Sequence, residues 1–333
     1  MKTFALTLGA CFALLIWGCD APRDNPFDPK SKNYVGPDLN VGVVSGTVAD
    51  LSYTPLSGVH IFTIPEYRGA VTNLQGAYSI EGLNLRTYQI VCAPAGYEPD
   101  TANVDLTEDA VVTVDFNLNA LPFIVDFKVI SRFIDPSQQL QPYYLVSAFA
   151  AISELDGKDD LQNVALHIQN GFSALMNYDS TNTFIHYYSK ILPEAELPGA
   201  SVDSIGDKLI WCTAEDQGGN SDSSDALFIA RFFDNYPFLL SPIDDETVST
   251  PTPTLRWEAF NVPFYFTYHA LVYNGQNNPP LVWEKSNISA DVTMVVTDSL
   301  PNSNYYYWTL EVSDIFGNTA LSAPVDFNVL FIP

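Results

Sequence analysis

From Val41 onward the chain alternates short runs of apolar and polar residues, and Gly, Pro, Asn and Asp interrupt it every few positions. Almost no sustained 3.6-residue repeat is present. Alternation of period two places successive side chains on opposite faces of a strand, whereas an amphipathic helix needs the longer period. The pattern therefore predicts an all-β fold, and we expect three tandem β-sandwich domains.

The start of the chain has a different pattern. Lys2 precedes an apolar run over residues 4–17, which ends shortly before Cys19. A charged start, a short apolar segment and a small residue before the cleavage point are features of a signal peptide, and the run is too short to span a bilayer comfortably. We interpret residues 1–18 as a cleaved signal peptide.

The end of this segment resembles the lipobox of bacterial lipoproteins, in which an aliphatic residue and usually two small residues precede a modified cysteine. Ile16, Gly18 and Cys19 match this pattern, and Trp17 departs from it. The resemblance implies that Cys19 is lipidated and anchors the protein to a membrane. The alternative is an ordinary signal peptide with an incidental cysteine.

Residues 19–40 are polar and lack helical or strand periodicity, and Pro22, Pro26 and Pro29 favour an extended backbone. We expect a flexible tether. Asp20, the second residue of the mature chain, resembles a signal for inner-membrane retention in enterobacteria, but other phyla sort differently. The expected location is the cell envelope, with the outer membrane favoured over the inner membrane.

Composition excludes several classes of partner. The 333 residues include 14 Lys and Arg against 39 Asp and Glu, a net charge of −25 that becomes −26 once residues 1–18, with Lys2 and no acid, are removed. Such a chain repels nucleic acid and anionic lipid, so the anchor rather than the surface must hold it to a membrane. Solubility explains the charge, and a surface that needs divalent cations is the alternative.

Two cysteines belong to the folded part. Cys92 and Cys212 lie in apolar, strand-like runs about a whole domain apart. We expect each to be a small buried core residue rather than half of a disulfide.

Residues 41–120 resemble the carboxypeptidase regulatory-like domain. The resemblance rests on four motifs, G-x-V at 46–48, P-L-x-G-V at 55–59, T-N-x-x-G-x-Y-x-I at 72–80 and G-L-x-x-x-x-Y at 82–88. The family implies a seven-stranded sandwich similar to prealbumin, which is attached to a catalytic domain in metallocarboxypeptidases and to other modules in many bacterial surface proteins.

Each motif has a physical reason. Asn73 to Gly76 supplies residues that tolerate positive φ in a hairpin turn, and Tyr78 and Ile80 fall on one face of the strand that follows. Before Tyr97, Gly96 predicts a further turn.

Motifs for catalysis are missing from the sequence. It contains no G-x-S-x-G, H-E-x-x-H, C-x-x-C or phosphate-binding glycine loop, and no cofactor is expected. A zinc peptidase needs at least two histidines and a carboxylate at one metal. The four histidines are scattered without ligand spacing: His60, His167, His186 and His269.

The remaining chain splits near residues 235–237 into two parts that end alike. The motif D-x-x-G-N begins at Asp216 and again at Asp314, 98 positions later. Recurrence at domain spacing predicts two similar sandwiches. We interpret each motif as a turn between strands, the later strands being 225–232 and 323–330; a calcium loop is the alternative.

Residues 236–333 resemble a bacterial fibronectin type III domain. Pro251 to Trp257 matches its proline-led strand with a core tryptophan, and Leu300 followed by Tyr306 matches its tyrosine corner. After this corner, Trp308, Leu310 and Val312 alternate inward. Residues 121–235 are less distinctive, and an immunoglobulin-like sandwich is the best interpretation.

Two groups are candidate sites. Asp156, Asp159 and Asp160 could hold a cation, against the alternative of a solvated acidic turn. Tyr265, Tyr305 and Tyr307 are expected to face outward and could form a row of rings that binds a ligand, although most aromatic residues here belong to strand cores.

The sequence thus predicts a non-enzymatic, lipid-anchored envelope protein that serves adhesion, assembly or scaffolding, with a protein or polysaccharide of the cell envelope as its partner. A glycan-binding lipoprotein that feeds a partner transporter or enzyme is the alternative. An unrecognised hydrolase is a third hypothesis, because catalytic triads assemble from residues far apart in sequence.

Overall fold

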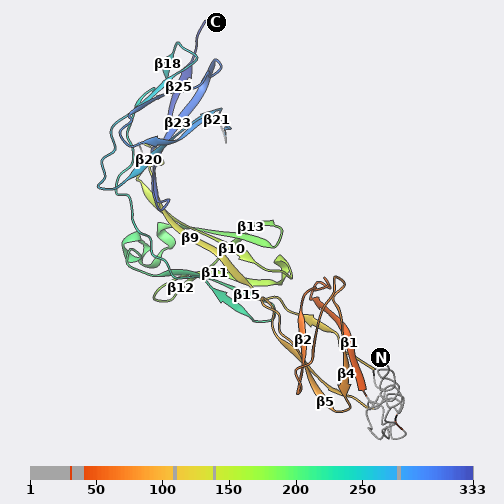
Figure 1. The fold of residues 1–333 in the computed structure, drawn as a ribbon. Helices are drawn as coiled ribbons and strands as arrows, with labels where there is room; N and C mark the ends of the chain where they lie inside the picture. The colour runs from red at the N-terminus through yellow and green to blue at the C-terminus, as the bar shows by residue number, and fades with distance from the viewer. Residues whose placement is uncertain (1–30, 32–40, 108–110, 138–139, 276–278, 333) are drawn as a thin grey trace, which may run out of the picture. The chain divides into compact units, whose positions relative to one another are not determined.

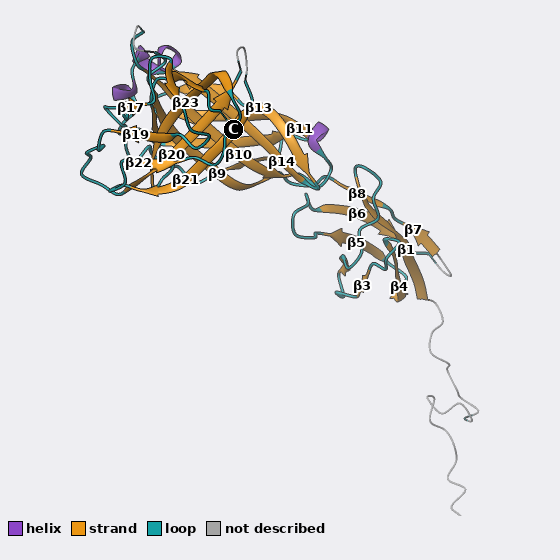
Figure 2. Cartoon of the chain, turned by 90° about the horizontal axis from the view of Figure 1, so that it is seen from above, coloured by secondary structure: helices purple, strands orange, loops and turns teal. Residues whose placement is uncertain are grey.

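The computed structural model describes residues 31, 41–107, 111–137, 140–275 and 279–332. The predicted signal peptide, Cys19 and nearly all of the tether lie outside these residues. The described chain folds almost wholly into strands joined by turns and short 3-10 helices, so the all-β prediction is confirmed (Figure 1; Figure 2).

The chain divides into two compact units. The first unit takes its described residues from Met1–Ala49, Tyr53–Pro94 and Pro99–Leu118, and the second takes them from Asp50–Ser52, Ala95–Glu98 and Asn119–Pro333.

The first unit is built from two four-stranded sheets. One has the order β4-β1-β7, with β8 also paired to β1, and the other has the order β3-β2-β5-β6. The strands are β1 (Val41–Asp50), β2 (His60–Ile64), β3 (Gly69–Val71), β4 (Ala77–Asn84), β5 (Thr87–Cys92), β6 (Asp100–Asp105), β7 (Val111–Thr113) and β8 (Phe116–Leu118).

The predicted hairpin turn is confirmed in this unit. The side-chain oxygen of Asn73 accepts hydrogen bonds from the backbone N–H groups of Gln75 (2.9 Å) and Ala77 (3.0 Å). Beyond the turn, Tyr78 and Ile80 are both buried, as the alternation of a strand requires.

The first unit has eight described strands, whereas the resemblance implied seven, because the last strand is interrupted. Between β7 and β8, the carboxylate of Asp115 accepts hydrogen bonds from the backbone N–H (2.7 Å) and the hydroxyl (2.8 Å) of Thr47 on β1. The side chain thus takes the place of a backbone acceptor at this point. Counted as one strand, β7 and β8 restore the expected number.

The second unit contains one large sheet and two small ones. The ten-stranded sheet runs β13-β14-β10-β9-β24-β23-β20-β21 with β25 on β23 and β18 on β25, and the small sheets are β12-β11-β15-β16 and β17-β19-β22. Its first strands are β9 (Phe123–Ile134), β10 (Tyr143–Ser153), β11 (Leu161–Ile168), β12 (Phe172–Leu175), β13 (Asn177–Asn182), β14 (Ile185–Pro193), β15 (Ile210–Asp216) and β16 (Ser221–Ser223).

The later strands of this unit are β17 (Leu239–Ser241), β18 (Glu246–Val248), β19 (Thr254–Trp257), β20 (Phe266–Asn274), β21 (Leu281–Ser289), β22 (Met294–Val296), β23 (Ser303–Asp314), β24 (Thr319–Leu321) and β25 (Val325–Val329). Four three-residue 3-10 helices complete it: η1 (Lys158–Asp160), η2 (Glu194–Glu196), η3 (Pro198–Ala200) and η4 (Val202–Ser204).

Two apolar cores lie within the second unit. The first core consists of buried residues between positions 124 and 229, and the second core consists of buried residues between positions 233 and 329. The second core contains Trp257, Trp308, Leu310 and Val312, all of them almost completely buried, so the inward alternation predicted after the tyrosine corner is confirmed.

Backbone pairing joins the two cores. Residues Arg132 to Ile134 of β9 pair in parallel with Thr319 to Leu321 of β24, which places strands from both cores in one sheet. Next to this pairing, the side-chain oxygen of Asn318 accepts a 2.9 Å hydrogen bond from the backbone N–H of Ser131. The sequence alone did not indicate this connection.

Both D-x-x-G-N motifs form the predicted turn. In each, the aspartate carboxylate accepts a hydrogen bond from the backbone N–H of the asparagine, at 2.7 Å for Asn220 and 2.9 Å for Asn318. The glycines have φ of 86° and 85°, a left-handed conformation that favours glycine.

The strand predicted over 225–232 is wrong. In this segment only Leu227 pairs, through an isolated bridge to Ile210. Ile229 belongs to one core and Phe233 to the other, so the segment crosses from core to core instead of continuing beside a partner strand. The strand predicted over 323–330 is confirmed as β25.

Candidate functional site

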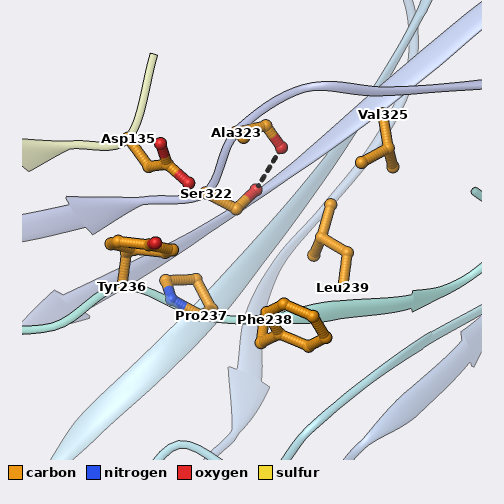
Figure 3. A pocket seen from close by; sticks show the side chains of 8 residues that line it. All are labelled: Asp135, Tyr236, Pro237, Phe238, Leu239, Ser322, Ala323 and Val325. Carbon is orange, nitrogen blue, oxygen red and sulfur yellow. Dashed lines mark hydrogen bonds between the residues drawn. The ribbon is translucent and has the colours of Figure 1, made fainter. Parts of the chain in front are cut away.

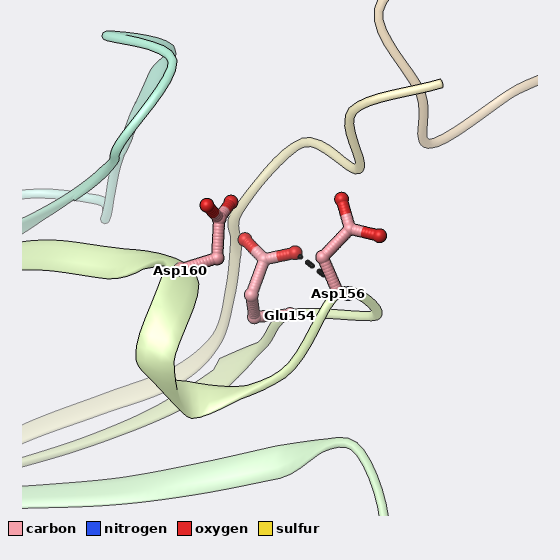
Figure 4. A group of neighbouring side chains, drawn as sticks. All are labelled: Glu154, Asp156 and Asp160. Atoms are coloured by element: carbon pink, nitrogen blue, oxygen red, sulfur yellow. Dashed lines mark hydrogen bonds between the residues drawn. The ribbon is translucent and has the colours of Figure 1, made fainter. Parts of the chain in front are cut away.

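Three carboxylates meet in the loop that connects β10 to β11. Glu154, Asp156 and Asp160 each place an oxygen within 4.8 Å of the others. Figure 4 shows the Glu154 carboxylate lying between the side chains of Asp160 and Asp156. This group is called the acidic loop below.

The turn of the chain explains why these side chains converge. The backbone N–H of Gly157 donates to the carbonyl of Glu154 (3.3 Å), and the N–H of Asp160 donates to the carbonyl of Gly157 (3.0 Å). In addition, the N–H of Asp156 donates to Glu154 Oε1 at 3.2 Å. Two consecutive tight turns therefore bring the carboxylates of the acidic residues close to one another.

Burial makes this arrangement costly for negative charge. Glu154 is completely buried, and its Oε2 has no hydrogen-bond partner, nor does Oδ2 of Asp160. Burial, together with the negative charges of Asp160, Asp156 and Asp216, raises the pKa of Glu154 to about 7. Two like charges about 5 Å apart repel by roughly 3 kcal/mol at an effective dielectric constant of about 20.

Asp216 is close enough to the acidic loop to raise the pKa of Glu154 and Asp160, and both oxygens of its own carboxylate accept hydrogen bonds. Asn220 donates to it from its backbone N–H (2.7 Å) and its side-chain amide (3.0 Å), and the side-chain amide of Asn119 donates at 2.8 Å. Because the amide nitrogen of Asn119 is engaged, its oxygen is available, and this buried oxygen has no hydrogen-bond partner.

Asp156 holds two other segments of the same unit. One of its oxygens accepts from the backbone N–H of Leu51 (3.1 Å), and the other accepts from that of Ala120 (2.6 Å). Its pKa is raised, first by burial and then by nearby acids. Carboxylate oxygens have two lone pairs each, so both can also bind an ion.

The structure brings together only part of the group expected from the sequence. Asp156 and Asp160 belong to it, but the side chain of Asp159 is 97% exposed and forms an ion pair with Lys158 at 2.9 Å. Glu154 takes the third place. Its position was detectable, because it falls two residues after buried Ile152 in an alternating strand, where a charged side chain must point inward.

Oxygen-only ligands define the chemistry that this group supports. Hard divalent cations prefer carboxylate and carbonyl oxygens, whereas zinc prefers nitrogen and sulfur. Within the part of the chain that the structure describes, no Lys or Arg forms an ion pair with Glu154, Asp156, Asp160 or Asp216.

The three candidate tyrosines do not form a continuous row. Tyr265 and Tyr305 are 66% and 54% exposed, and Tyr307 is half-buried. Tyr307 pairs with Tyr273 across β23 and β20, whereas Tyr265 precedes Phe266, which pairs at the opposite end of these strands. Tyr265 and Tyr307 therefore lie on the same face of the sheet but at opposite ends of these strands.

A groove with a different aromatic set lies on this face. Tyr273 and Tyr307 stack with ring centroids 4.8 Å apart and an interplanar angle of 14°. They line an open groove of about 740 Å³ together with Tyr143, Arg132 and Glu311. Tyr143 and Tyr273 were not among the candidates from the sequence. Their place depends on β9 and β24 pairing, which no local pattern reveals.

Charged groups border the groove. The Arg132 guanidinium lies 3.6 Å from the Glu311 carboxylate, and His269 Nε2 lies 2.8 Å from that of Glu284. Burial raises the pKa of Glu311, and Arg132 and His269 partly offset that shift. Rings and hydrogen-bonding groups at one surface are typical of sites that bind small polar ligands.

A second pocket is too small for such a ligand. Figure 3 shows it between residues 236–239 and the segment that carries Ser322 and Ala323, with Asp135 and Tyr236 at one end. Its volume is about 50 Å³. Since a water molecule occupies about 30 Å³, the pocket has room for a water or two.

The described histidines offer no catalytic triad. His60 is exposed on a strand. His167 bonds to the Thr213 hydroxyl at 2.8 Å, and His186 lies between the Thr181 hydroxyl and the Glu154 carbonyl. His269 bonds only to the carboxylate of Glu284. A triad requires a histidine that bonds to a carboxylate on one side and to a hydroxyl or thiol on the other, and none of the four histidines does so.

Both cysteines of the folded part are buried and free, as predicted. Among the described residues, no helix is long and apolar enough to cross a membrane.

Sequence comparison identifies one domain family. Residues 43–119 match the carboxypeptidase regulatory-like domain, which confirms the resemblance drawn from the motifs of residues 41–120. No curated protein matches the chain.

Solved structures with a similar arrangement of strands include three from different organisms. BcpA, the major pilin subunit of Bacillus cereus, is 12% identical, with 88% of this chain and 98% of that chain covered and a TM-score of 0.31. The FN1–FN3 domains of chicken CNTN1 are 12% identical, with 83% and 92% covered and a TM-score of 0.31. A putative carbohydrate-binding protein from Bacteroides uniformis is 13% identical, with 58% and 99% covered and a TM-score of 0.23.

Proposed function

We propose that the protein is a non-enzymatic, lipid-anchored protein of the cell envelope, whose β-sandwiches serve adhesion, assembly or scaffolding. The observation that carries this proposal is the pairing of β9 with β24. Neighbouring domains move relative to each other by default unless a large interface joins them, and a shared sheet removes that freedom between the two cores of the second unit. Two cores that are held rigidly together in this way suit a spacer or scaffold.

The proposed attachment is the lipidated Cys19, which lies outside the described residues. Replacing it in Cys19→Ser should abolish incorporation of labelled palmitate and release the protein from the membrane fraction. Cys11→Ser is the matched control, because Cys11 lies in the same segment upstream of the proposed cleavage point. Membrane retention of Cys19→Ser without label would contradict the anchor. Separating inner from outer membranes tests the preference for the outer membrane.

The proposed partner is a protein or a polysaccharide of the envelope. The tagged full chain can be crosslinked in intact membranes, purified and analysed for bound proteins. Repeated recovery of the same envelope assembly protein would support scaffolding. Recovery of lipid without protein would contradict a protein partner and leave polysaccharide binding as the better explanation.

Glycan binding is the second candidate function, and the groove that contains Tyr273 and Tyr307 favours it. Stacked rings beside charged groups can hold the apolar face of a sugar while polar side chains bind its hydroxyls. A lipid-anchored protein with such a groove could deliver polysaccharide to a partner transporter or enzyme.

A glycan array probed with the full chain tests this candidate. We expect Tyr307→Ala to lose binding and Tyr265→Ala to keep it, because Tyr265 lies on the same face at the other end of the strands. Equal binding by both variants would remove the groove as the binding site.

A further inference from the structure

We propose that the acidic loop binds one calcium ion through carboxylate oxygens of Glu154, Asp156 and Asp160, with the side-chain oxygen of Asn119 as a further ligand. This inference does not depend on the anchor, the partner or the glycan groove. It assigns a ligand to a group of acids that forms no ion pair with Lys or Arg among the described residues.

The spacing of the carboxylate oxygens fits a calcium ion. Calcium binds oxygens at 2.3–2.6 Å, so two ligands on opposite sides of one ion lie up to about 5 Å apart. The three carboxylates place oxygens within 4.8 Å of one another. Magnesium requires near-ideal octahedral geometry and keeps several of its waters, so it uses only one or two protein carboxylates, whereas calcium accepts the larger set of oxygens offered here.

One oxygen of Glu154 lacks a hydrogen-bond partner, and this supports a cation independently of the clustering. Glu154 is completely buried, and its Oε2 points into the group without a hydrogen-bond partner (Figure 4). A buried carboxylate oxygen is normally paired, because removing it from water without compensation is expensive. A cation in contact with Oε2 supplies that compensation.

Two further orphan oxygens have the same explanation. Oδ2 of Asp160 and Oδ1 of Asn119 are also buried without partners, and the amide of Asn119 is fixed by its bond to Asp216. Neutral oxygens complete a calcium shell when carboxylates are few, and waters fill what remains. Asp216 itself stays outside the shell, since Asn119 and Asn220 already satisfy its carboxylate.

The site joins parts of the second unit that are distant in sequence. Asn119 is the last residue that matches the carboxypeptidase regulatory-like domain, Ala120 follows it, and Asp156 already binds the backbone of Ala120. Calcium would hold this segment to the β10–β11 loop. We therefore expect the stability of the second unit to depend on calcium.

Calorimetric titration of the full chain in detergent, freed of metal with a chelator, tests the proposal. We expect one calcium per chain with a dissociation constant between about 10 µM and 1 mM, the range from sensor sites to extracellular modules. Saturating calcium should raise the unfolding temperature by about 3 °C or more. Absence of both effects at 10 mM calcium chloride would overturn the proposal, and magnesium binding of equal affinity would overturn the choice of ion.

Glu154→Gln and Asp159→Asn form the matched pair of variants. Glu154→Gln should weaken calcium binding at least about tenfold, whereas exposed Asp159→Asn should bind like the unmodified chain. In chelator, Glu154→Gln should unfold at a higher temperature than the unmodified chain, because one repelling charge is gone. If it fails to fold, Asp160→Asn provides the same test. Unchanged affinity in either acidic-loop variant would refute the site.

Discussion

The hydroxyl of Tyr306 donates a 2.9 Å hydrogen bond to the carbonyl oxygen of Pro301, five residues upstream. Tyr306 is almost completely buried, and its ring stacks on Phe327 with centroids 5.3 Å apart. This bond is the tyrosine corner that the sequence indicated, and it identifies Tyr306 as the corner residue. The corner fixes the path of the chain before β23, which carries Trp308 into the core.

Tyr306→Phe should therefore weaken the second unit. Removal of a buried hydroxyl from a satisfied bond costs about 1 kcal/mol and leaves the Pro301 carbonyl without this donor. The free energy of unfolding in urea, followed by tryptophan fluorescence, measures the change, since Trp257 and Trp308 lie in the same core. Tyr305→Phe is the control because Tyr305 is exposed. Equal stabilities of the two variants would show that the corner bond contributes nothing.

Two glycines of the first unit should respond very differently to alanine. Gly76 and Gly58 have φ of 71° and 77°. A Cβ on Gly76 would lie 2.4 Å from the carbonyl oxygen of Val48, whereas a Cβ on Gly58 meets nothing within 4 Å. Gly58→Ala should cost about 1 to 2 kcal/mol for its backbone conformation alone, and Gly76→Ala roughly 3 kcal/mol or more.

Hydrogen exchange of the β1 peptide reports this difference, because Val48 lies on β1. Faster exchange in Gly76→Ala than in Gly58→Ala is expected. The reverse order would mean that the hairpin relaxes away from Val48.

Features that depend on neighbouring residues were predictable from the sequence. Period-two alternation located β25, and D-x-x-G-N specified its turn because the aspartate bonds to amides only a few positions away. The buried Tyr78 and Ile80 follow from the same local rule.

Features that depend on residues distant in sequence were not predictable. The pairing of β9 with β24 joins positions almost two hundred residues apart, and alternation does not specify the partner of a strand. The acidic loop shows an intermediate case. Proximity in sequence suggested Asp159, but the turn directs the side chain of Asp159 to solvent. Glu154, the residue directly after β10, is buried in the group instead.

The free thiols should be inert in the folded chain. Burial, with a smaller contribution from a nearby aspartate in each case, raises the pKa of Cys92 to about 11 and that of Cys212 to about 12. Since the thiolate is the reactive form, its fraction at pH 8 is very small and increases only as the pH approaches these values.

A thiol reagent at pH 8 tests this in a chain that carries Cys11→Ser and Cys19→Ser. We expect no reaction in the folded state and two reacting thiols in guanidinium chloride. A third substitution, Ser180→Cys on the exposed strand β13, is the control that should react at once. Rapid labelling of Cys92 or Cys212 in the folded chain would contradict their burial.

Asn318→Ala should weaken the connection between the two cores. The side-chain oxygen of Asn318 accepts from the backbone N–H (2.9 Å) and the hydroxyl (3.3 Å) of Ser131, and its amide donates to Asp314 at 3.1 Å. Alanine leaves the Ser131 N–H buried without its acceptor, which costs about 1 to 3 kcal/mol. Calorimetry should show a lower unfolding temperature and a split of the second unit's transition into two, because β9 then holds β24 less firmly. Asn177→Ala, on exposed β13, should leave the transition unchanged. A single transition at the original temperature in Asn318→Ala would show that the backbone pairing alone couples the cores.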